Sequence, residues 1–193
     1  MRALVVRRFG GLDGVELASW PAPIPGPGDV LVRVRAASLN PIDAKIRAGA
    51  MRAYVKIEPP YVSGRDFAGT IEDRGDGVND LPLDTLVVGV ADLERGSHAG
   101  LVAVPRANLA AAPEGLDPVA AASLGVAGLS AFIPLVEMAD VRAGQRVLIL
   151  GGAGGVGTLG VQIAVARGAT VYATTRPPRE KLLRDLGAAG IVD

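Results

Sequence analysis

The first hundred residues alternate short apolar runs with turn-forming residues. Residues 29–36 place apolar and polar side chains alternately, directly after a turn rich in Pro and Gly at 25–28. An alternation with period two is typical of a β-strand buried on one face. Further strands are predicted at residues 2–6, 67–72, 86–90 and 100–104. Many short strands at this spacing indicate a small β-barrel or sandwich.

The pattern changes at Asp117 and Pro118, an N-cap residue followed by proline at the first helical position. Alanine-rich helical sequence follows, in which Pro134 marks a kink or a restart. The chain then alternates strands at 146–150, 170–175 and 190–193 with helices at 158–167 and 179–186. This alternation is one half of a doubly wound parallel sheet. The first of these helices is apolar nearly all round, which predicts that it is buried.

A glycine turn follows the strand at 146–150. Gly152, Gly154 and Gly157 fit the spacing G-x-G-x-x-G, and helical sequence begins directly afterwards. We assign the dihedral angles of the tight turn to Gly152, because glycine adopts them without strain. Gly154 has no Cβ to hold a pyrophosphate away from the backbone, and Gly157 lets the helix pack close to the strand. The N–H groups at the helix start, with about half a positive charge from the helix dipole, would receive the phosphates.

The turn therefore predicts a dinucleotide site, with a structural Gly-rich turn as the alternative. The residues expected to bind the cofactor there are Gly152, Ala153, Gly154, Gly155, Val156 and Gly157.

The end of the next strand bears on the choice of cofactor. A site selective for NAD places Asp or Glu there, about 20 residues after the glycines, to bind the ribose hydroxyls. This chain has Thr174, Thr175 and Arg176 at that point, with Lys181 one turn into the next helix. Two cations can pair with a 2′-phosphate, so the sequence favours NADPH. The alternative is that Arg176 and Arg179 are solvated loop residues.

Composition excludes several other classes of function. The 193 residues contain 20 acidic and 20 basic side chains, with a pI near 6.6, which gives no indication of nucleic-acid binding. There is no Cys and a single His, His98, so disulfides and a thiolate or multi-histidine zinc site are excluded. No Ser/His/Asp or Cys/His constellation is present either. We expect no metal.

Two long uncharged stretches, 118–136 and 147–166, contain several glycines, and the first also contains prolines. Both are better explained as buried elements of an α/β domain than as membrane spans. Charge interrupts the N-terminus too early for a signal peptide, so we expect a cytoplasmic location without membrane partners.

Seven motifs, in order along nearly the whole chain, resemble one protein family. They are Pro25-Gly-Pro-Gly-Asp-Val-Leu-Val32, Ala36-Ala-Ser-Leu-Asn-Pro-Ile-Asp43, Ile46-Arg-Ala-Gly49, Gly64-Arg-Asp-Phe-Ala-Gly69, Gly96-Ser-His-Ala99, Leu129-Ser-Ala131 and Leu150-Gly-Gly-Ala-Gly-Gly-Val-Gly157. Together they are similar to the zinc-free, quinone-oxidoreductase-like branch of the medium-chain dehydrogenase/reductase superfamily. The resemblance implies an α/β chain with a GroES-like β-barrel domain at 1–117 and a Rossmann NAD(P)-binding domain at 118–193, of which this chain would hold the first half.

The resemblance also implies a reaction and two further site residues. NADPH would transfer a hydride to a small molecule, a quinone or an activated alkene such as an enone. Asn40 resembles the asparagine beside the nicotinamide, in a catalytic and cofactor-binding role; the alternative is an asparagine bonded to its own turn. Ser130 stands where relatives carry a cofactor-contacting Thr or Ser, and a helix cap is its alternative. Tyr54 is a weaker candidate proton donor, and His98 is expected to pack within the β domain.

Two places where the metal-dependent branch carries zinc ligands hold other residues here. Residues 38–43 read Ser-Leu-Asn-Pro-Ile-Asp, and Gly64-Arg65-Asp66 replaces a Gly-His-Glu triplet. Residues 83–88, in turn, lack the Gly-Asp pair usual in the branch.

Length is the main departure from the family, because members continue into a second half of the Rossmann sheet. We expect the strand at 146–150 to be a sheet edge, where an apolar strand invites aggregation or a partner. A shortened product, a homo-oligomer in which another subunit completes the chain, and a poorly binding remnant all remain open. The functional alternatives are a nucleotide-binding or scaffold protein without turnover, and an enoyl-thioester reductase with acyl-carrier substrates.

Overall fold

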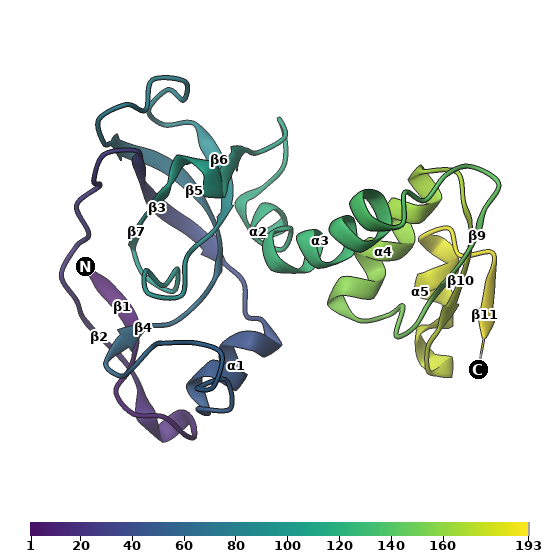
Figure 1. Ribbon diagram of the computed structural model, residues 1–193, viewed down its shortest axis with the longest axis horizontal. Helices are drawn as coiled ribbons and strands as arrows, with labels where there is room; N and C mark the ends of the chain where they lie inside the picture. The colour runs from purple at the N-terminus through teal and green to yellow at the C-terminus, as the bar shows by residue number, and fades with distance from the viewer. Residues whose placement is uncertain (193) are drawn as a thin grey trace. The chain divides into compact units, whose positions relative to one another are not determined.

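The computed structural model describes residues 1–192, which divide into two compact units, Met1–Val126 and Ala127–Asp193. We call them unit 1 and unit 2 and describe each by itself (Figure 1). In residues 1–192, none of the helices has both the length and the apolar character that crossing a membrane requires.

Unit 1 is built on two antiparallel sheets. The smaller has the order β2-β1-β4, from β1 (Arg2–Val6), β2 (Val15–Ser19) and β4 (Tyr61–Val62). The larger has the order β7-β3-β5-β6-β8, from β3 (Asp29–Ala37), β5 (Asp66–Arg74), β6 (Leu86–Val90), β7 (Leu101–Pro105) and β8 (Leu109–Ala111). The connecting helical elements are η1 (Leu12–Gly14), α1 (Pro41–Arg47), η2 (Arg106–Asn108), α2 (Pro118–Ala122) and α3 (Gly125–Phe132), whose last residues belong to unit 2.

The alternation predicted for residues 29–36 produces the main core of unit 1. Val30 and Val32 of β3 are fully buried with Val102 and Val104 of β7, and they pack in one cluster with Phe67. Burying an aliphatic side chain of this size contributes about 1.5–3 kcal/mol. Strands β3 and β5 form the centre of this sheet, so their ends are held rigidly.

A β-bulge lies near the C-terminal end of β3, where the register against β5 shifts between Val34 and Ala36. Beyond it, Ala37 pairs with Phe67, so the end of β3 lies beside the beginning of β5. Bulges bend a strand and re-aim its side chains. The segment from Ser38 to the start of α1 therefore leaves the sheet next to Asp66.

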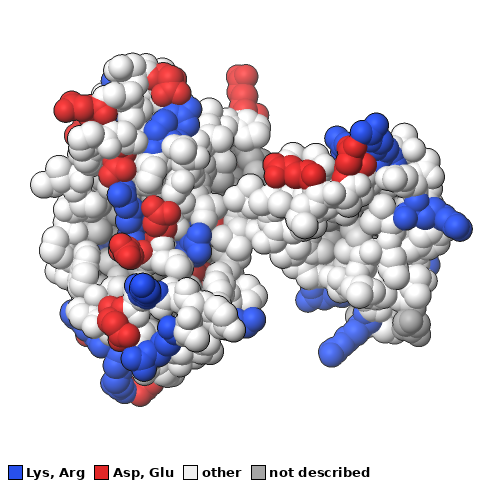
Figure 2. Space-filling model, in the orientation of Figure 1, with Lys and Arg blue, Asp and Glu red and all other residues white. Residues whose placement is uncertain are grey.

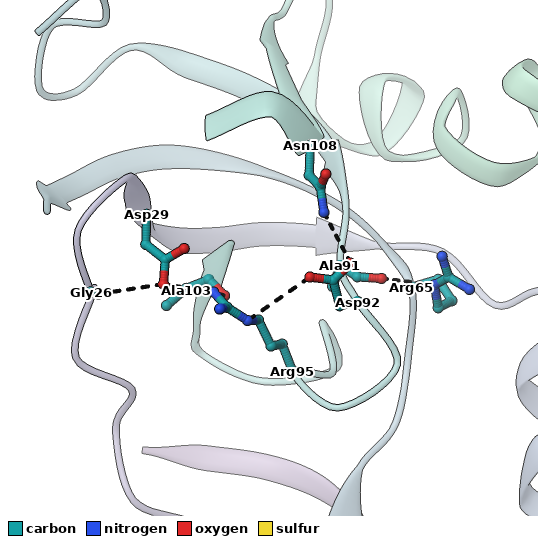
Figure 3. Close-up of polar contacts among 8 residues, drawn as sticks. All are labelled: Gly26, Asp29, Arg65, Ala91, Asp92, Arg95, Ala103 and Asn108. Atoms are coloured by element: carbon teal, nitrogen blue, oxygen red, sulfur yellow. Dashed lines mark hydrogen bonds and ion pairs between the residues drawn. The ribbon is translucent and has the colours of Figure 1, made fainter. Parts of the chain in front are cut away.

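The loop between β6 and β7 is fixed to the sheet by side-chain bonds (Figure 3). Arg95 Nη1 pairs with Asp29 Oδ2 at 2.7 Å and donates to the Ala103 carbonyl oxygen at 3.1 Å. At the loop start, Asn108 Nδ2 donates to Asp92 Oδ1, and Arg65 Nε donates to the Ala91 carbonyl oxygen. The first half of the loop is thereby held in place, and the loop carries Ser97 and His98 toward the start of β5.

Unit 2 is a three-stranded parallel sheet in the order β11-β10-β9. Its strands are β9 (Arg146–Ile149), β10 (Thr170–Thr174) and β11 (Gly190–Val192). Its helical elements are the π-helical η3 (Ile133–Met138), α4 (Gly155–Ala166), the 3₁₀ turn η4 (Pro177–Arg179) and α5 (Glu180–Asp185). The α-helical hydrogen bonding changes to π-helical bonding at Pro134, where the sequence predicted a kink or a restart. Proline has no N–H to continue an α-helix.

The core of unit 2 lies between α4, α5 and the sheet. Val161 and Ala164 of α4 are buried with Val171, Ala173 and Leu183. The prediction that the helix at 158–167 is buried is right for one face only, because Gln162 and Ala166 are exposed. Helix α4 thus buries one face within unit 2.

Strand β9 lies at an edge of the parallel sheet, as expected for residues 146–150. Its Leu148 is 55% exposed and Leu150, just beyond the strand, is 75% exposed.

Candidate functional site

The glycine turn joins β9 to α4 and is bonded to the end of β10. Gly151 N donates to Thr174 Oγ1 at 2.9 Å, and Gly152 N donates to the Thr174 carbonyl oxygen at 2.9 Å. These bonds hold the turn at the carboxyl edge of the parallel sheet, where open α/β sheets bind ligands.

The dihedral assignment made for Gly152 is wrong. The positive φ of the turn, +68°, belongs to Gly151. Gly152 is needed for space instead, because a Cβ there would lie 2.7 Å from the Cβ of Ala173. The sequence pattern does not show which residue needs the positive φ and which needs the space, because the two residues are adjacent glycines.

The structure agrees with the reasons given for glycine at positions 157 and 154. A Cβ on Gly157 would lie 2.3 Å from the Gly151 carbonyl oxygen, so the close approach of α4 to the turn requires glycine. Gly154 is the N-cap of α4 in an extended conformation, and the first turn of the helix contains no acidic residue. The first N–H groups of a helix have no partner within it. An anion is the group that this end of α4 can bind.

A cavity of about 560 Å³ opens on one side of the turn. Gly151 and Gly154 of the turn line it together with Thr175 and Arg176, which follow β10. Arg179 also lines it, and its Nη1 donates to the Ala153 carbonyl oxygen at 3.1 Å. The cavity therefore brings Arg176 and Arg179 together with the N-cap of α4, and none of the residues within 1–192 that line it carries a carboxylate.

A second cavity of about 430 Å³ opens beside the same turn. Its lining residues include Ser130, Leu148 and the glycines from Gly154 to Gly157. Ser130 is exposed and lies in α3. Both cavities share Gly151 and Gly154, so a ligand seated on the turn has space on either side of it.

Lys181 is not among the residues that line either cavity. Its side chain is 86% exposed and its Nζ pairs with Asp185 Oδ2 at 2.7 Å, one helical turn along α5. The structure thus brings Gly151–Gly157, Ser130, Thr174–Arg176 and Arg179 together, and leaves Lys181 apart.

Asn40 belongs to a polar cluster in unit 1, at the end of β3. Its Nδ2 donates to Asp66 Oδ2 at 2.8 Å and to Ser38 Oγ at 3.2 Å. Its backbone N–H donates to Asp43 Oδ2 at 2.7 Å, within the capping box that begins α1. Burial raises the pKa of the Asp43 carboxyl, and this backbone hydrogen bond offsets part of the rise.

His98 bridges two parts of the same cluster. Its Nε2 lies 2.9 Å from the Ser38 carbonyl oxygen and its Nδ1 lies 2.9 Å from Ser63 Oγ. A carbonyl oxygen only accepts, so Nε2 carries the proton and Nδ1 is free to accept from the serine. Close packing accompanies these bonds, because a Cβ on Gly64 would lie 2.4 Å from the His98 ring.

Comparison with known proteins identifies the two units. Residues 26–114 match the family model of the alcohol dehydrogenase GroES-like domain. An alcohol dehydrogenase superfamily protein from Novosphingobium aromaticivorans superposes with a TM-score of 0.93 and 39% identity, over 100% of this chain and 58% of its own.

The resemblance to the medium-chain dehydrogenase/reductase superfamily is confirmed, because the solved structures that this chain is similar to are quinone oxidoreductases and alcohol dehydrogenases of that superfamily. The quinone oxidoreductase from Coxiella burnetii superposes on this chain with a TM-score of 0.88 and 33% identity, over 100% of this chain and 62% of its own. A mycobacterial protein complexed with NADPH gives a TM-score of 0.87 and 31% identity, over 100% of this chain and 58% of its own.

The curated relatives that this chain is similar to include two kinds of protein. The mitochondrial NAD(P)H oxidoreductase RTN4IP1 of Drosophila melanogaster is 36% identical over 100% of this chain and 52% of its own. A mycocerosic acid synthase-like polyketide synthase of Mycobacterium tuberculosis is 35% identical over 98% of this chain and 9% of its own. The chain thus spans about half the length of the fly protein and a small part of the synthase.

These matches and the sheet topology confirm the predicted fold class of the chain, an α/β chain with a GroES-like β domain and a partial parallel sheet. Within residues 1–192, no three His, Cys, Asp or Glu side chains gather closely enough to hold a metal ion. Tyr54, the weak candidate proton donor, is 83% exposed.

The structure adds two site residues that sequence reasoning missed. Arg179 lines the larger cavity. The sequence did not predict this position, because the 3₁₀ turn η4 precedes α5 and directs the Arg179 side chain back toward the glycine turn. Asp66 is fully buried against Asn40, although 26 residues separate them. The pairing of β3 with β5 brings these residues together, and the motif Gly64-Arg-Asp66 was its only sequence signal.

Proposed function

We propose that this chain binds NADPH at the glycine turn of unit 2 and belongs to an oxidoreductase that reduces a quinone or an activated alkene without a metal. The observation that carries the proposal is the cavity of about 560 Å³, which combines the N-terminus of α4 with Arg176 and Arg179. The NAD(P)H oxidoreductase name of the fly relative and the NADPH complex of the mycobacterial neighbour support it.

The residues of the turn fit a dinucleotide. Gly151 supplies the positive φ, and Gly154 leaves the helix N-terminus free of side-chain atoms where a pyrophosphate would approach. Arg176 and Arg179 would pair with a 2′-phosphate, and Thr174 and Thr175 line the wall between them and the turn. Ser130 would contact the cofactor from the second cavity.

The nicotinamide supplies the hydride when the cofactor is bound, so the protein has to bind, orient and exclude water. Asn40 would orient the reacting ring or the acceptor through its carboxamide, held by Asp66 and Ser38. The name of the quinone oxidoreductase neighbour supports a small quinone as the substrate, and an enone is the corresponding activated alkene. Cytoplasmic location and assembly into a homo-oligomer stay predictions.

Binding is tested by titrating the purified chain with NADPH and with NADH, following nicotinamide fluorescence. We expect saturation with both and tighter binding of NADPH, and we expect Arg176→Ala to weaken NADPH more than NADH. A titration that never saturates contradicts the proposal as a whole. Equal losses for the two cofactors contradict the 2′-phosphate assignment.

A second candidate is an enoyl-thioester reductase. The polyketide synthase relative favours it, since 98% of this chain aligns with a segment of that protein. Turnover measured in parallel with a small quinone and with an enoyl thioester distinguishes the two substrates. NADPH binding without turnover of either would favour a nucleotide-binding protein that is not an enzyme.

A further inference from the structure

The Asp66 carboxylate is fully buried at the first residue of β5 and accepts from three directions. Ser38 Oγ and Asn40 Nδ2 donate to its Oδ2 at 2.7 and 2.8 Å, and Val126 N donates to its Oδ1 at 2.8 Å. A buried carboxylate is costly unless its oxygens receive hydrogen bonds. The three donors lie at the end of β3, at the N-cap of α1 and in the first turn of α3.

The surroundings of Asp66 are shaped for a carboxylate. A Cβ on Gly125 would lie 2.5 Å from Asp66 Oδ1, so glycine is required where α3 begins. The start of a helix also favours a negative charge through its dipole and its free N–H groups. Asp66 is therefore held in one orientation by α3 on one side and by the β3 end on the other.

This network decides which atom of the Asn40 carboxamide stays free. An amide nitrogen has two hydrogens, and here they face Asp66 Oδ2 and Ser38 Oγ. Ser38 donates its hydroxyl hydrogen to Asp66, so the Ser38 Oγ can accept a hydrogen bond from Asn40. Both N–H groups of Asn40 are thus engaged inside the cluster. Oδ1 faces the Asp43 N–H in the capping box, and its second lone pair is left for a ligand.

We propose that Asp66 is a positioning residue: it fixes the Asn40 carboxamide with its oxygen as the acceptor, so that the group bound there must be a hydrogen-bond donor. Resting on the proposed function, that donor is the carboxamide N–H of nicotinamide. An acceptor-only group such as a quinone oxygen is then excluded from direct contact with Asn40 while Asp66 is a carboxylate.

The substitution Asp66→Asn inverts this arrangement. An Asn side chain has one acceptor oxygen, so it cannot accept from Val126, Ser38 and Asn40 together. With its oxygen on Val126 N, its NH₂ group faces Asn40, which must turn its own oxygen inward. The NH₂ of Asn40 then becomes the free group, and the site offers donors in place of an acceptor.

The test is hydrogen exchange of the Asn40 side-chain NH₂, followed by NMR and assigned from the signals lost in Asn40→Asp. We expect slow exchange in the wild type and exchange at least about tenfold faster in Asp66→Asn, a loss of about 1.4 kcal/mol of protection. Restored protection of the amide pair, now carried by residue 66, is expected in the double variant N40D/D66N. Unchanged protection of Asn40 in Asp66→Asn overturns the proposal.

Two further variants keep the test decisive. Ser97→Ala is the matched control, because buried Ser97 Oγ bonds the main-chain oxygen of Asp66 rather than its carboxylate. It should leave Asn40 exchange unchanged. Ser38→Ala removes one acceptor and should expose one of the two Asn40 hydrogens while the other stays protected; this result decides the question if Asp66→Asn does not fold. Equal protection of both hydrogens in Ser38→Ala contradicts the proposal.

Nucleotide binding separates this inference from the proposed function. If exchange responds as expected but NADPH does not bind, the orientation by Asp66 stands and the nicotinamide as its ligand is wrong. If NADPH binds, Asp66→Asn should raise the Kd for NADPH while Ser97→Ala does not. NADPH binding that is unaffected by Asp66→Asn overturns the assignment of the donor to nicotinamide.

Discussion

Arg179 donates a hydrogen bond from Nη1 to the main-chain oxygen of Ala153, at 3.1 Å, and this bond joins the η4 turn to the glycine turn. The guanidinium is thereby fixed at the wall of the larger cavity, on the same side as Arg176. Its remaining N–H groups are available to an anion, because a guanidinium carries five donors.

We predict that Arg179→Ala weakens NADPH binding roughly tenfold and NADH binding much less, since a charged hydrogen bond is worth about 1.5–3 kcal/mol. Lys181→Ala is the control: its ammonium already pairs with Asp185, so both affinities should stay within about twofold. Isothermal titration of each variant with both cofactors gives the comparison. A larger loss of NADPH affinity in Lys181→Ala than in Arg179→Ala would show that Lys181, and not Arg179, binds the 2′-phosphate.

Gly157 and Gly155 form a second matched pair in the first turn of α4. Gly157→Ala brings a Cβ to 2.3 Å from the Gly151 carbonyl oxygen, and we expect a loss of about 1–3 kcal/mol in the free energy of unfolding. Gly155→Ala meets no atom within 4 Å and should be neutral or stabilise by up to about 1 kcal/mol. Urea unfolding followed by circular dichroism measures both, and equal effects would argue against the close packing.

Asp84 adopts a left-handed backbone conformation, with φ of +60°, in the segment that departs from the family's Gly-Asp pair. A side chain with a Cβ is strained there by about 1–2 kcal/mol, and Asp tolerates it better than Ala. We predict that Asp84→Gly unfolds at a higher temperature than Asp84→Ala, with the wild type between them. Differential scanning calorimetry checks this order, and a more stable Ala variant would refute the backbone argument.

The half-buried Asp43 carboxyl makes stability depend on pH in one direction. Its pKa is raised above its ordinary value of 3.8, so the folded chain binds this proton more tightly than the unfolded chain. Its contribution to stability is therefore present at acid pH and is lost as the pH rises through the folded pKa. Asp43→Asn keeps an oxygen to accept the Asn40 N–H, and stays neutral.

We predict that Asp43→Asn gains stability relative to the wild type as the pH rises from about 3.5 to about 6.5. Urea unfolding at a series of pH values measures the difference. A difference that does not change with pH, or that changes in the wild type's favour, would mean that burial does not control this carboxyl.

The sequence predicted the strands and helices whose own residues carry the signal. Strand β6 occupies the predicted residues 86–90, and Asp117 caps α2 through bonds to the N–H groups of Val119 and Ala120. Short elements such as β4 and β8 were missed, because two or three residues show no periodicity and their pairing partners lie far away in the chain.

The residues of the candidate site also fall into those that the sequence predicted and those that it did not. The glycine turn was predictable because the residues that it requires are close together in the sequence. The positive φ, however, belongs to Gly151 and not to the predicted Gly152. The role of Asp66 could not be predicted from the local sequence, because its partners Ser38 and Val126 come from other elements and meet it only in the folded chain. Whether the assembled residues bind NADPH stays a prediction.

The chain contains one tryptophan, Trp20, and it packs beside Ala3, Val5 and Val62 of the smaller sheet in unit 1. Emission excited in the indole band therefore reports melting of unit 1, whereas far-ultraviolet ellipticity also registers the helices of unit 2. Denaturation curves from these two probes will coincide if both units melt as a single cooperative block, and will separate if each melts independently.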